Sequence, residues 1–144
     1  MSADFTLPIG VAKIERSGKD VTLTAHAMGV KYALDAAEQL QRQGIEAEVI
    51  NLRTIRPLDI ETIKKSVTKT HHLVTIDNGW PFGNIGAEIG SQVTESEAYD
   101  YLDGPIMRVT GVDVPMPYAL PLELAALPTP TDVVKMVKKS MNMN

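Results

Sequence analysis

Three histidines are the residues of this sequence best suited to metal binding or proton transfer. His71 and His72 are adjacent, and His26 stands far from both of them. Adjacent side chains on a helix or a strand point in different directions, so His71 and His72 are poorly placed to hold one metal ion. The sequence contains no Cys, which excludes a thiolate metal site, a Cys nucleophile and a disulfide. We therefore predict structural or surface roles for the histidines, and no metal site.

A glycine-containing segment is the next candidate, because backbone amides near the start of a helix can bind anions. Gly79, Gly83 and Gly86 lie in this segment. The two glycine-rich phosphate-binding motifs, Gly-x-Gly-x-x-Gly and Gly-x-x-x-x-Gly-Lys-Ser/Thr, are both absent from the sequence. The glycines serve equally well in a tight turn beside Trp80, which is the interpretation we favour. Glu88 follows early in a predicted helix, where its carboxylate complements the helix dipole, so we assign it to helix stabilisation. The serines lack the Gly-x-Ser-x-Gly pattern that exposes a nucleophile.

Two arginines follow a predicted buried strand. Arg53 and Arg56 bracket Thr54 and Ile55, and a planar guanidinium binds carboxylates well. They fit either a contact with a neighbouring subunit or a local salt bridge, and the sequence does not separate the two.

Composition indicates one soluble globular domain spanning residues 1–144, with Met1–Ala3 interpreted as an expression start. Hydrophobic residues make up 44% of the chain and charged residues 22%. The 14 Lys and Arg against 18 Asp and Glu give a net charge of -4, which provides no general attraction to nucleic acid. No apolar run is long enough to span a membrane, and the first eight residues lack a signal-peptide pattern.

The hydrophobic pattern predicts alternating strands and helices. Residues 11–16 and 20–27 flank a Ser-Gly-Lys turn signal, which predicts a hairpin. Three further strands are predicted at 47–52, 72–77 and 106–110, and helices are predicted from Gly29 to Gly44, from Asp59 to Val67, at 85–96 and at 131–141. The proline-rich segment 111–130 is predicted to be a loop.

This order predicts an α/β fold: a three-layer sandwich with a mostly parallel five-stranded sheet and one antiparallel edge strand. In such sheets ligands and partners gather beyond the carboxyl ends of the strands, which directs attention to residues 53–59, 77–85 and 111–121.

Several stretches carry a resemblance to a known family. They are DF at residues 4–5, PIG at 8–10, AKIER at 12–16, EVINLRTIRPLD at 48–59, GWP at 79–81, GAEI at 86–89, RVTG at 108–111 and DVPMPYA at 113–119. Together and in this order they resemble the beta subunits of pyruvate dehydrogenases, within the transketolase C-terminal domain family, from about residue 4 to the end. The resemblance implies the same mostly parallel five-stranded sheet.

The resemblance also implies where the chemistry lies. In this family thiamine diphosphate is activated by a Glu in the N-terminal half of the beta subunit, and the alpha subunit holds the diphosphate and Mg. We therefore expect no catalytic, cofactor-binding or metal-binding residue in this chain. The full enzyme would convert pyruvate to acetyl-lipoyl and carbon dioxide, with the cofactor acting as electron sink.

The partners implied are the alpha subunit, a second beta subunit and the basic peripheral binding domain of the dihydrolipoyl acyltransferase, with no nucleic acid and no membrane. Related subunits use an acidic residue in a Leu-Asp-x-Pro turn and the terminal carboxylate, which match Asp103 and Asn144. A turn-initiating Asp before Gly104 and Pro105 is equally explained without a partner. The tail from Ser140 onward departs from the usual family ending.

Three alternatives remain at this point. A branched-chain 2-oxoacid or acetoin dehydrogenase beta subunit would share the chemistry with another substrate, although the DVPMPYA run favours the pyruvate type. A standalone interaction module without an enzyme partner is the alternative from a different class. The resemblance places the protein in the mitochondrial matrix, with the bacterial cytoplasm as the other location.

Overall fold

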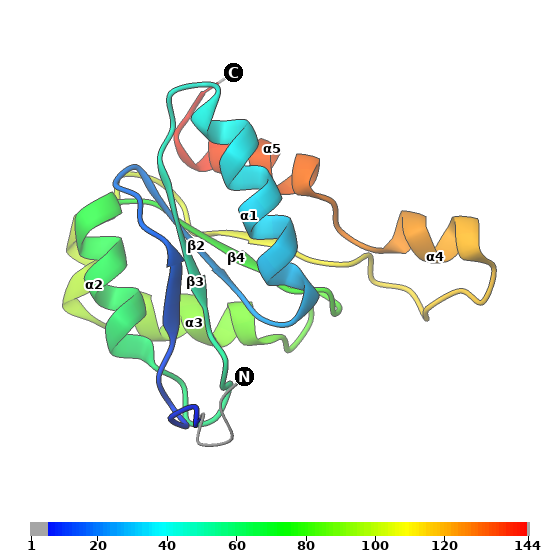
Figure 1. Cartoon of the computed structure of the whole chain (residues 1–144), viewed down its shortest axis with the longest axis horizontal. Coiled ribbons are helices and arrows are strands. Elements are labelled where there is room, and N and C mark those ends of the chain that lie inside the picture. Colours follow the sequence, from blue (N-terminus) through cyan, green and yellow to red (C-terminus); the bar gives the residue numbers. More distant parts are fainter. Residues whose placement is uncertain (1–5, 144) are drawn as a thin grey trace.

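A five-stranded mixed sheet forms the centre of the computed structural model, which describes residues 6–143. The strand order is β1-β3-β2-β4-β5, in which β1 is antiparallel to β3 and the other pairs are parallel. The strands are β1 Lys13–Arg16, β2 Val21–Ala25, β3 Ala47–Asn51, β4 Leu73–Ile76 and β5 Met107–Val109 (Figure 1). The predicted α/β class, the five strands and the single antiparallel edge are confirmed.

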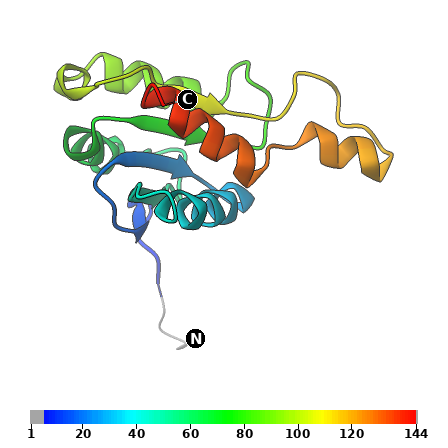
Figure 2. The ribbon, with the colours of Figure 1, turned by 90° about the horizontal axis from the view of Figure 1, so that it is seen from above.

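Helices pack on both faces of this sheet. The helical elements of the chain's described part are α1 Met28–Gln41, α2 Ile60–Thr70, α3 Ile85–Thr94, the 3-10 helix η1 Glu97–Tyr101, α4 Leu120–Ala126 and α5 Pro130–Ser140, of which α1, α2, α3 and α5 cover the sheet. One apolar cluster joins α1 and α5 to the sheet, and a second joins α2 and α3 to the opposite face. The end of α1 and the start of α2 lie close to their predicted positions. Gly44 follows α1 with φ of 81°. The Asp59 side chain caps α2 by accepting a hydrogen bond from Thr62 N. Both views show α4 extending away from the sheet (Figure 1, Figure 2).

The predicted hairpin is wrong. β1 pairs with β3, in a register that sets Lys13 opposite Asn51, and β3 lies between β1 and β2. The connection crosses the start of β3: Lys19 N and Asp20 N both donate to Glu46 O at 3.0 Å. At Gly18 an added Cβ would lie 2.2 Å from the Ala47 carbonyl carbon, so the crossing requires glycine. The turn signal was therefore real, but it marks a crossing and not a two-strand turn.

The expectation of a continuous loop at 111–130 is also wrong in part, because α4 occupies Leu120–Ala126. Pro121 stands in the first turn of α4, where proline needs no hydrogen-bond partner and its φ suits a helix. The prolines therefore mark helix starts here, as Pro130 does for α5.

Candidate functional site

The three histidines contact different surroundings. His71 Nδ1 lies 3.0 Å from Asp103 Oδ2, while His72 Nδ1 lies 3.3 Å from Ser140 Oγ. The Nδ1 of His26 is buried and has no hydrogen-bond partner among the described residues. Across residues 6–143 there is no group of three or more His, Asp or Glu side chains arranged to hold a metal ion.

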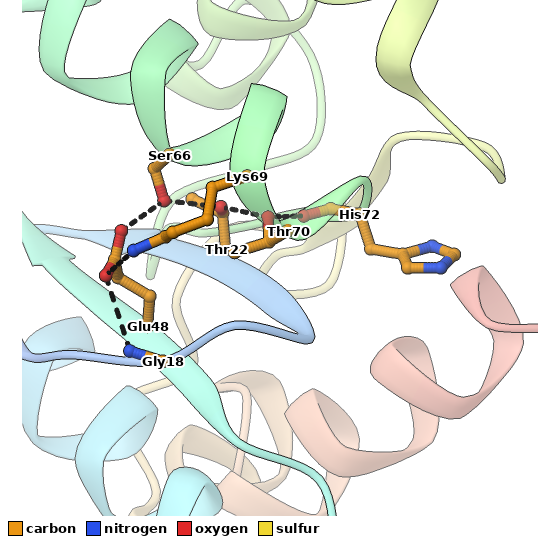
Figure 3. Close-up of polar contacts among 7 residues, drawn as sticks. All are labelled: Gly18, Thr22, Glu48, Ser66, Lys69, Thr70 and His72. Carbon is orange, nitrogen blue, oxygen red and sulfur yellow. Dashed lines mark hydrogen bonds and ion pairs between the residues drawn. The ribbon is translucent and has the colours of Figure 1, made fainter.

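Glu48 is the most deeply buried acidic side chain in the described part of the chain, with 2% of its surface exposed. Its Oε1 accepts a hydrogen bond from Ser66 Oγ at 2.7 Å, and its Oε2 accepts one from Gly18 N at 3.3 Å. Lys69 Nζ forms a close ion pair with the same Oε2 (Figure 3). Sequence reasoning missed this residue, although a Glu between the apolar Ala47 and Val49 of a buried strand requires a charged or hydroxyl partner.

Hydroxyl groups continue the Glu48 network along α2. Thr22 Oγ1 lies 2.6 Å from both Ser66 Oγ and Thr70 Oγ1, and Thr70 Oγ1 donates to the His72 carbonyl at 3.2 Å. The His72 carbonyl lies in this network while its ring points away from it (Figure 3). Both carboxylate oxygens of Glu48 are engaged, so the network clamps β2, β3 and α2 together and offers no vacant base for chemistry.

Asp103 lies on the rim of an exposed acidic hollow. The hollow has a volume of about 640 Å³ and is lined by Thr94, Tyr99, Asp100, Leu102, Asp103, Gly104, Pro105 and Ile106. The lining carries two carboxylates and neither Lys nor Arg. The side chain of Asp103 is 67% exposed, which leaves it accessible to a partner. We call this surface the acidic hollow.

The end of α5 packs against the same turn. Ser140 Oγ donates to the Pro105 carbonyl at 3.1 Å. An added Cβ on Gly104 would lie 2.1 Å from the Ser140 carbonyl oxygen, so glycine permits this approach. The structure thus brings the C-terminal helix to the acidic hollow, although Asn144 itself lies outside the described residues.

Arg53 and Arg56 are both exposed, and neither forms an ion pair with any residue between 6 and 143. Arg53 contributes to the field that lowers the carboxyl pKa of Glu15, after the larger effects of hydrogen bonds from Lys13 and Asn51. The local salt bridge is therefore absent from the described structure, and the subunit contact stays a prediction.

Large apolar side chains gather on the segment that leads through α4. We define the apolar arm as the exposed residues Val112, Val114, Met116, Tyr118, Leu120, Leu122 and Leu124, together with Trp80 and Phe82 of the β4–α3 loop. Trp80 Nε1 donates to the Val114 carbonyl at 2.9 Å, which ties the loop to the arm. Tyr118 is fully exposed and Phe82 is 90% exposed. An apolar surface of this extent on a projecting segment indicates an interface.

Comparison with known protein families shows which family the chain belongs to. The sequence pattern described as "Transketolase, C-terminal domain" matches residues 10–133. The chain belongs to the transketolase C-terminal domain family. The family predicted from the sequence stretches is confirmed.

Relatives within this broader family extend the similarity over nearly the whole chain. The beta subunit of the mitochondrial pyruvate dehydrogenase E1 component from Ascaris suum is 63% identical over 142 residues, which is 99% of this chain and 39% of that protein. The corresponding subunit from Homo sapiens is 51% identical over 142 residues, covering 99% of this chain and 40% of that protein. The chain therefore spans about two-fifths of the length of these relatives.

A solved structure shares the fold. It is described as "Split gene transketolase, inactive beta4 tetramer", has a TM-score of 0.83 and 27% identity, and covers 99% of this chain and 45% of its own. The comparison confirms the transketolase-like sheet, with its one antiparallel pair. Among residues 6–143 of the present chain, no helix is long and apolar enough to cross a bilayer.

Proposed function

We propose that this chain is the C-terminal assembly and docking domain of the beta subunit of a pyruvate dehydrogenase decarboxylating component. The observation that carries the proposal is the 63% identity to the Ascaris suum beta subunit over 99% of this chain. The full enzyme would use thiamine diphosphate and Mg to convert pyruvate to acetyl-lipoyl and carbon dioxide. Both the Ascaris suum and the human relatives are named mitochondrial, which supports the mitochondrial matrix as the location.

Residues 6–143 do not form a site built for thiamine diphosphate and Mg. A Mg ion is usually bound through one or two carboxylates together with phosphate oxygens and water. The buried carboxylate of Glu48 is already engaged by Ser66 and Lys69, and residues 6–143 contain no group of three or more His, Asp or Glu side chains arranged to bind a cation. This supports our proposal that the domain contributes assembly and docking, and that the cofactor is held elsewhere in the full enzyme.

The apolar arm would contact the alpha subunit or the second beta subunit. Exposed Leu122 and Leu124 on α4 provide aliphatic contacts, and the exposed ring of Tyr118 provides the kind of aromatic anchor that dominates interface energetics. The related split-gene transketolase is described as a tetramer of beta chains, so association through beta chains has a precedent in this fold.

The acidic hollow would receive a basic side chain of the acyltransferase's peripheral binding domain. Asp100 and Asp103 supply its negative charge, and the packing of Ser140 against Pro105 places the end of α5 beside it. Opposite charges across an interface raise the association rate and select the partner. Asp103 and Asn144 remain the proposed docking residues.

The docking proposal is tested by substituting Asp103 in the full beta subunit assembled with its alpha subunit. Asp103→Lys should weaken binding of the peripheral binding domain at least tenfold at low ionic strength, because it places like charges together. Asp35→Lys on the exposed face of α1 is the matched control, since Asp35 contacts only Lys31 among the charged residues described. Unchanged affinity for Asp103→Lys would remove Asp103 from the docking site.

The assignment to a beta subunit is tested by exchange. These residues would replace the matching segment of the Ascaris suum beta subunit, and the chimera would be expressed with the alpha subunit. We expect assembly and acetylation of a lipoyl domain. The 144-residue chain alone, mixed with thiamine diphosphate, Mg and pyruvate, should release no carbon dioxide. A chimera that folds but does not assemble, or turnover by the chain alone, would overturn the assignment.

A further inference from the structure

We propose that His71 is a positioning residue for Asp103, and that it makes docking at the acidic hollow weaker in mild acid than at neutral or slightly alkaline pH. The inference rests on the proposed docking function of Asp103. His71 lies at the C-terminal cap of α2, and from the sequence alone we predicted only a structural or surface role for it.

His71 contacts Asp103 through both its backbone and its side chain. Asp103 N donates to the His71 carbonyl at 3.0 Å, and the ring Nδ1 lies 3.0 Å from Asp103 Oδ2. The two residues are 32 positions apart in the sequence, so these contacts fasten the end of α2 to the turn after η1. With its backbone fixed by one contact and a carboxylate oxygen held by the other, Asp103 has fewer alternative rotamers, which lowers the entropy lost when a partner binds.

The His71 ring is itself fixed. Its backbone has φ of 62° at the C-terminal cap of α2, and the ring meets Tyr101 edge to face with centroids 6.2 Å apart. The surrounding structure therefore determines where Nδ1 lies, as a positioning role requires.

The charge of the His71 ring changes the net charge that a basic partner meets at Asp103. A neutral His71 that donates through Nδ1 leaves Asp103 with its full negative charge. A protonated ring adds a positive charge at the same 3.0 Å contact and opposes a basic partner. Histidine is the side chain whose charge usually changes between about pH 5 and 8.

Other titratable groups near His71 have different environments. His72 is half-buried, and burial lowers its pKa despite the opposing field of Asp103, so it remains neutral at neutral pH. Tyr101 faces the ring, Asp100 lies across the hollow, and Lys69 is paired with Glu48. From α5, the group that meets this region is the uncharged Ser140 hydroxyl, which contacts His72.

Two substitutions of His71 distinguish its positioning of Asp103 from the effect of its own ring charge. His71→Asn keeps a side-chain N–H within reach of Asp103, tolerates the left-handed backbone and does not titrate. His71→Gly keeps the backbone bond to Asp103 but removes the ring. Both are made in the full beta subunit assembled with the alpha subunit, and affinity for the recombinant peripheral binding domain is measured at about pH 6 and about pH 8.

The wild type should bind roughly five- to tenfold more tightly at the higher pH, which is a typical size for a coupling between two sites. His71→Asn should match the wild type within about twofold at about pH 8 and should lose most of the pH dependence. His71→Gly should bind roughly three- to tenfold more weakly than the wild type at about pH 8, because Asp103 is no longer held. His72 and all partner groups are unchanged in these variants, so a flattened profile assigns the titration to His71.

The outcomes separate this inference from the docking proposal. If Asp103→Asn weakens binding while His71→Asn keeps the wild-type pH profile, the role of His71 is refuted and docking stands. If Asp103→Asn binds like the wild type, the docking proposal itself fails. A His71→Gly variant that is folded and binds like the wild type at both pH values also refutes the positioning role.

Discussion

At the scale of single residues, the chain uses its buried charge for structure. Glu48 sits in the central part of the sheet with only 2% of its surface exposed, and its charge is compensated by Lys69 from α2. A buried carboxylate that loses its partner is left with an uncompensated desolvation cost. Lys69 is 47% exposed, so solvent reduces the cost of losing it but does not remove it.

Replacing Lys69 by Met should lower the free energy of unfolding by about 1–3 kcal/mol, since the apolar stem is kept and the charge is lost. Lys31→Met is the matched control: Lys31 pairs with Asp35 on the exposed face of α1, where solvent screening leaves an ion pair with little effect on stability. Urea denaturation of both variants measures the difference. Equal losses in the two variants would show that Glu48 does not depend on Lys69.

At the scale of elements, local signals predicted the helices better than the strand pairing. The cap at Asp59 and the stop at Gly44 act within a few residues, and the structure has both. The pairing of β1 with β3 depends on the crossing at Gly18, which the turn signal alone does not distinguish from a hairpin. Likewise, the His71 contact with Asp103 joins residues that are 32 positions apart, so no local pattern indicates it.

The two glycines of α3 have different reasons to be glycine. An added Cβ on Gly86 would lie 2.3 Å from Thr75 Oγ1, whereas one on Gly90 would meet Ile106 Cγ2 at 3.9 Å. Gly86→Ala should therefore destabilise the fold by roughly 1–3 kcal/mol through overpacking. Gly90→Ala should stabilise it by about 0.5–1 kcal/mol through helix propensity. Thermal unfolding measures both, and a shift of the same sign in the two variants would contradict the assignment.

The cap of α2 should depend on pH. Burial raises the carboxyl pKa of Asp59, but hydrogen bonds from Ala12 N and from Thr62 outweigh it and hold the pKa below its usual value. The ionised cap therefore stabilises the folded state above the unfolded-state pKa of about 3.9, and this is lost as pH falls through the folded-state value.

Asp59→Asn keeps a capping oxygen and removes the charge. It should lower the free energy of unfolding by up to about 1 kcal/mol at about pH 6, discounted for solvent screening. The difference from the wild type should shrink as pH falls below about 4, which urea titrations at several pH values measure. A difference that stays constant down to about pH 2 would show that the charge of Asp59 does not stabilise the cap.

At the scale of the whole molecule, the sheet and its packed helices account for the buried core, and the apolar arm lies outside it. The two core clusters together involve α1, α2, α3 and α5, while α4 contributes exposed Leu122 and Leu124. Composition predicted one globular domain. It does not separate the apolar residues that form the core from those that a partner would cover. The exposed side chains of the arm therefore contribute little to the core, which separates the fold of this chain from the assembly role proposed for the arm.

That separation predicts the effect of the double variant Leu122→Thr/Leu124→Thr. Removing two leucines that are 59% and 61% exposed should change the free energy of unfolding of this chain by less than about 1 kcal/mol. In the full beta subunit, the same change should weaken assembly of the mixed alpha and beta subunits by about 10- to 100-fold if the arm holds interface anchors. Sedimentation of the mixed subunits at several concentrations measures the loss.

Ile14→Thr provides the control for that measurement. Ile14 is 46% exposed on β1, at the edge of the sheet opposite β5, so its replacement by Thr removes exposed apolar surface from outside the arm. If the Ile14 variant assembles normally and the arm variant does not, the loss belongs to the arm and not to exposed apolar surface in general. Normal assembly of a folded arm variant would instead mean that α4 projects for another purpose, and the assembly role proposed for the apolar arm would fall.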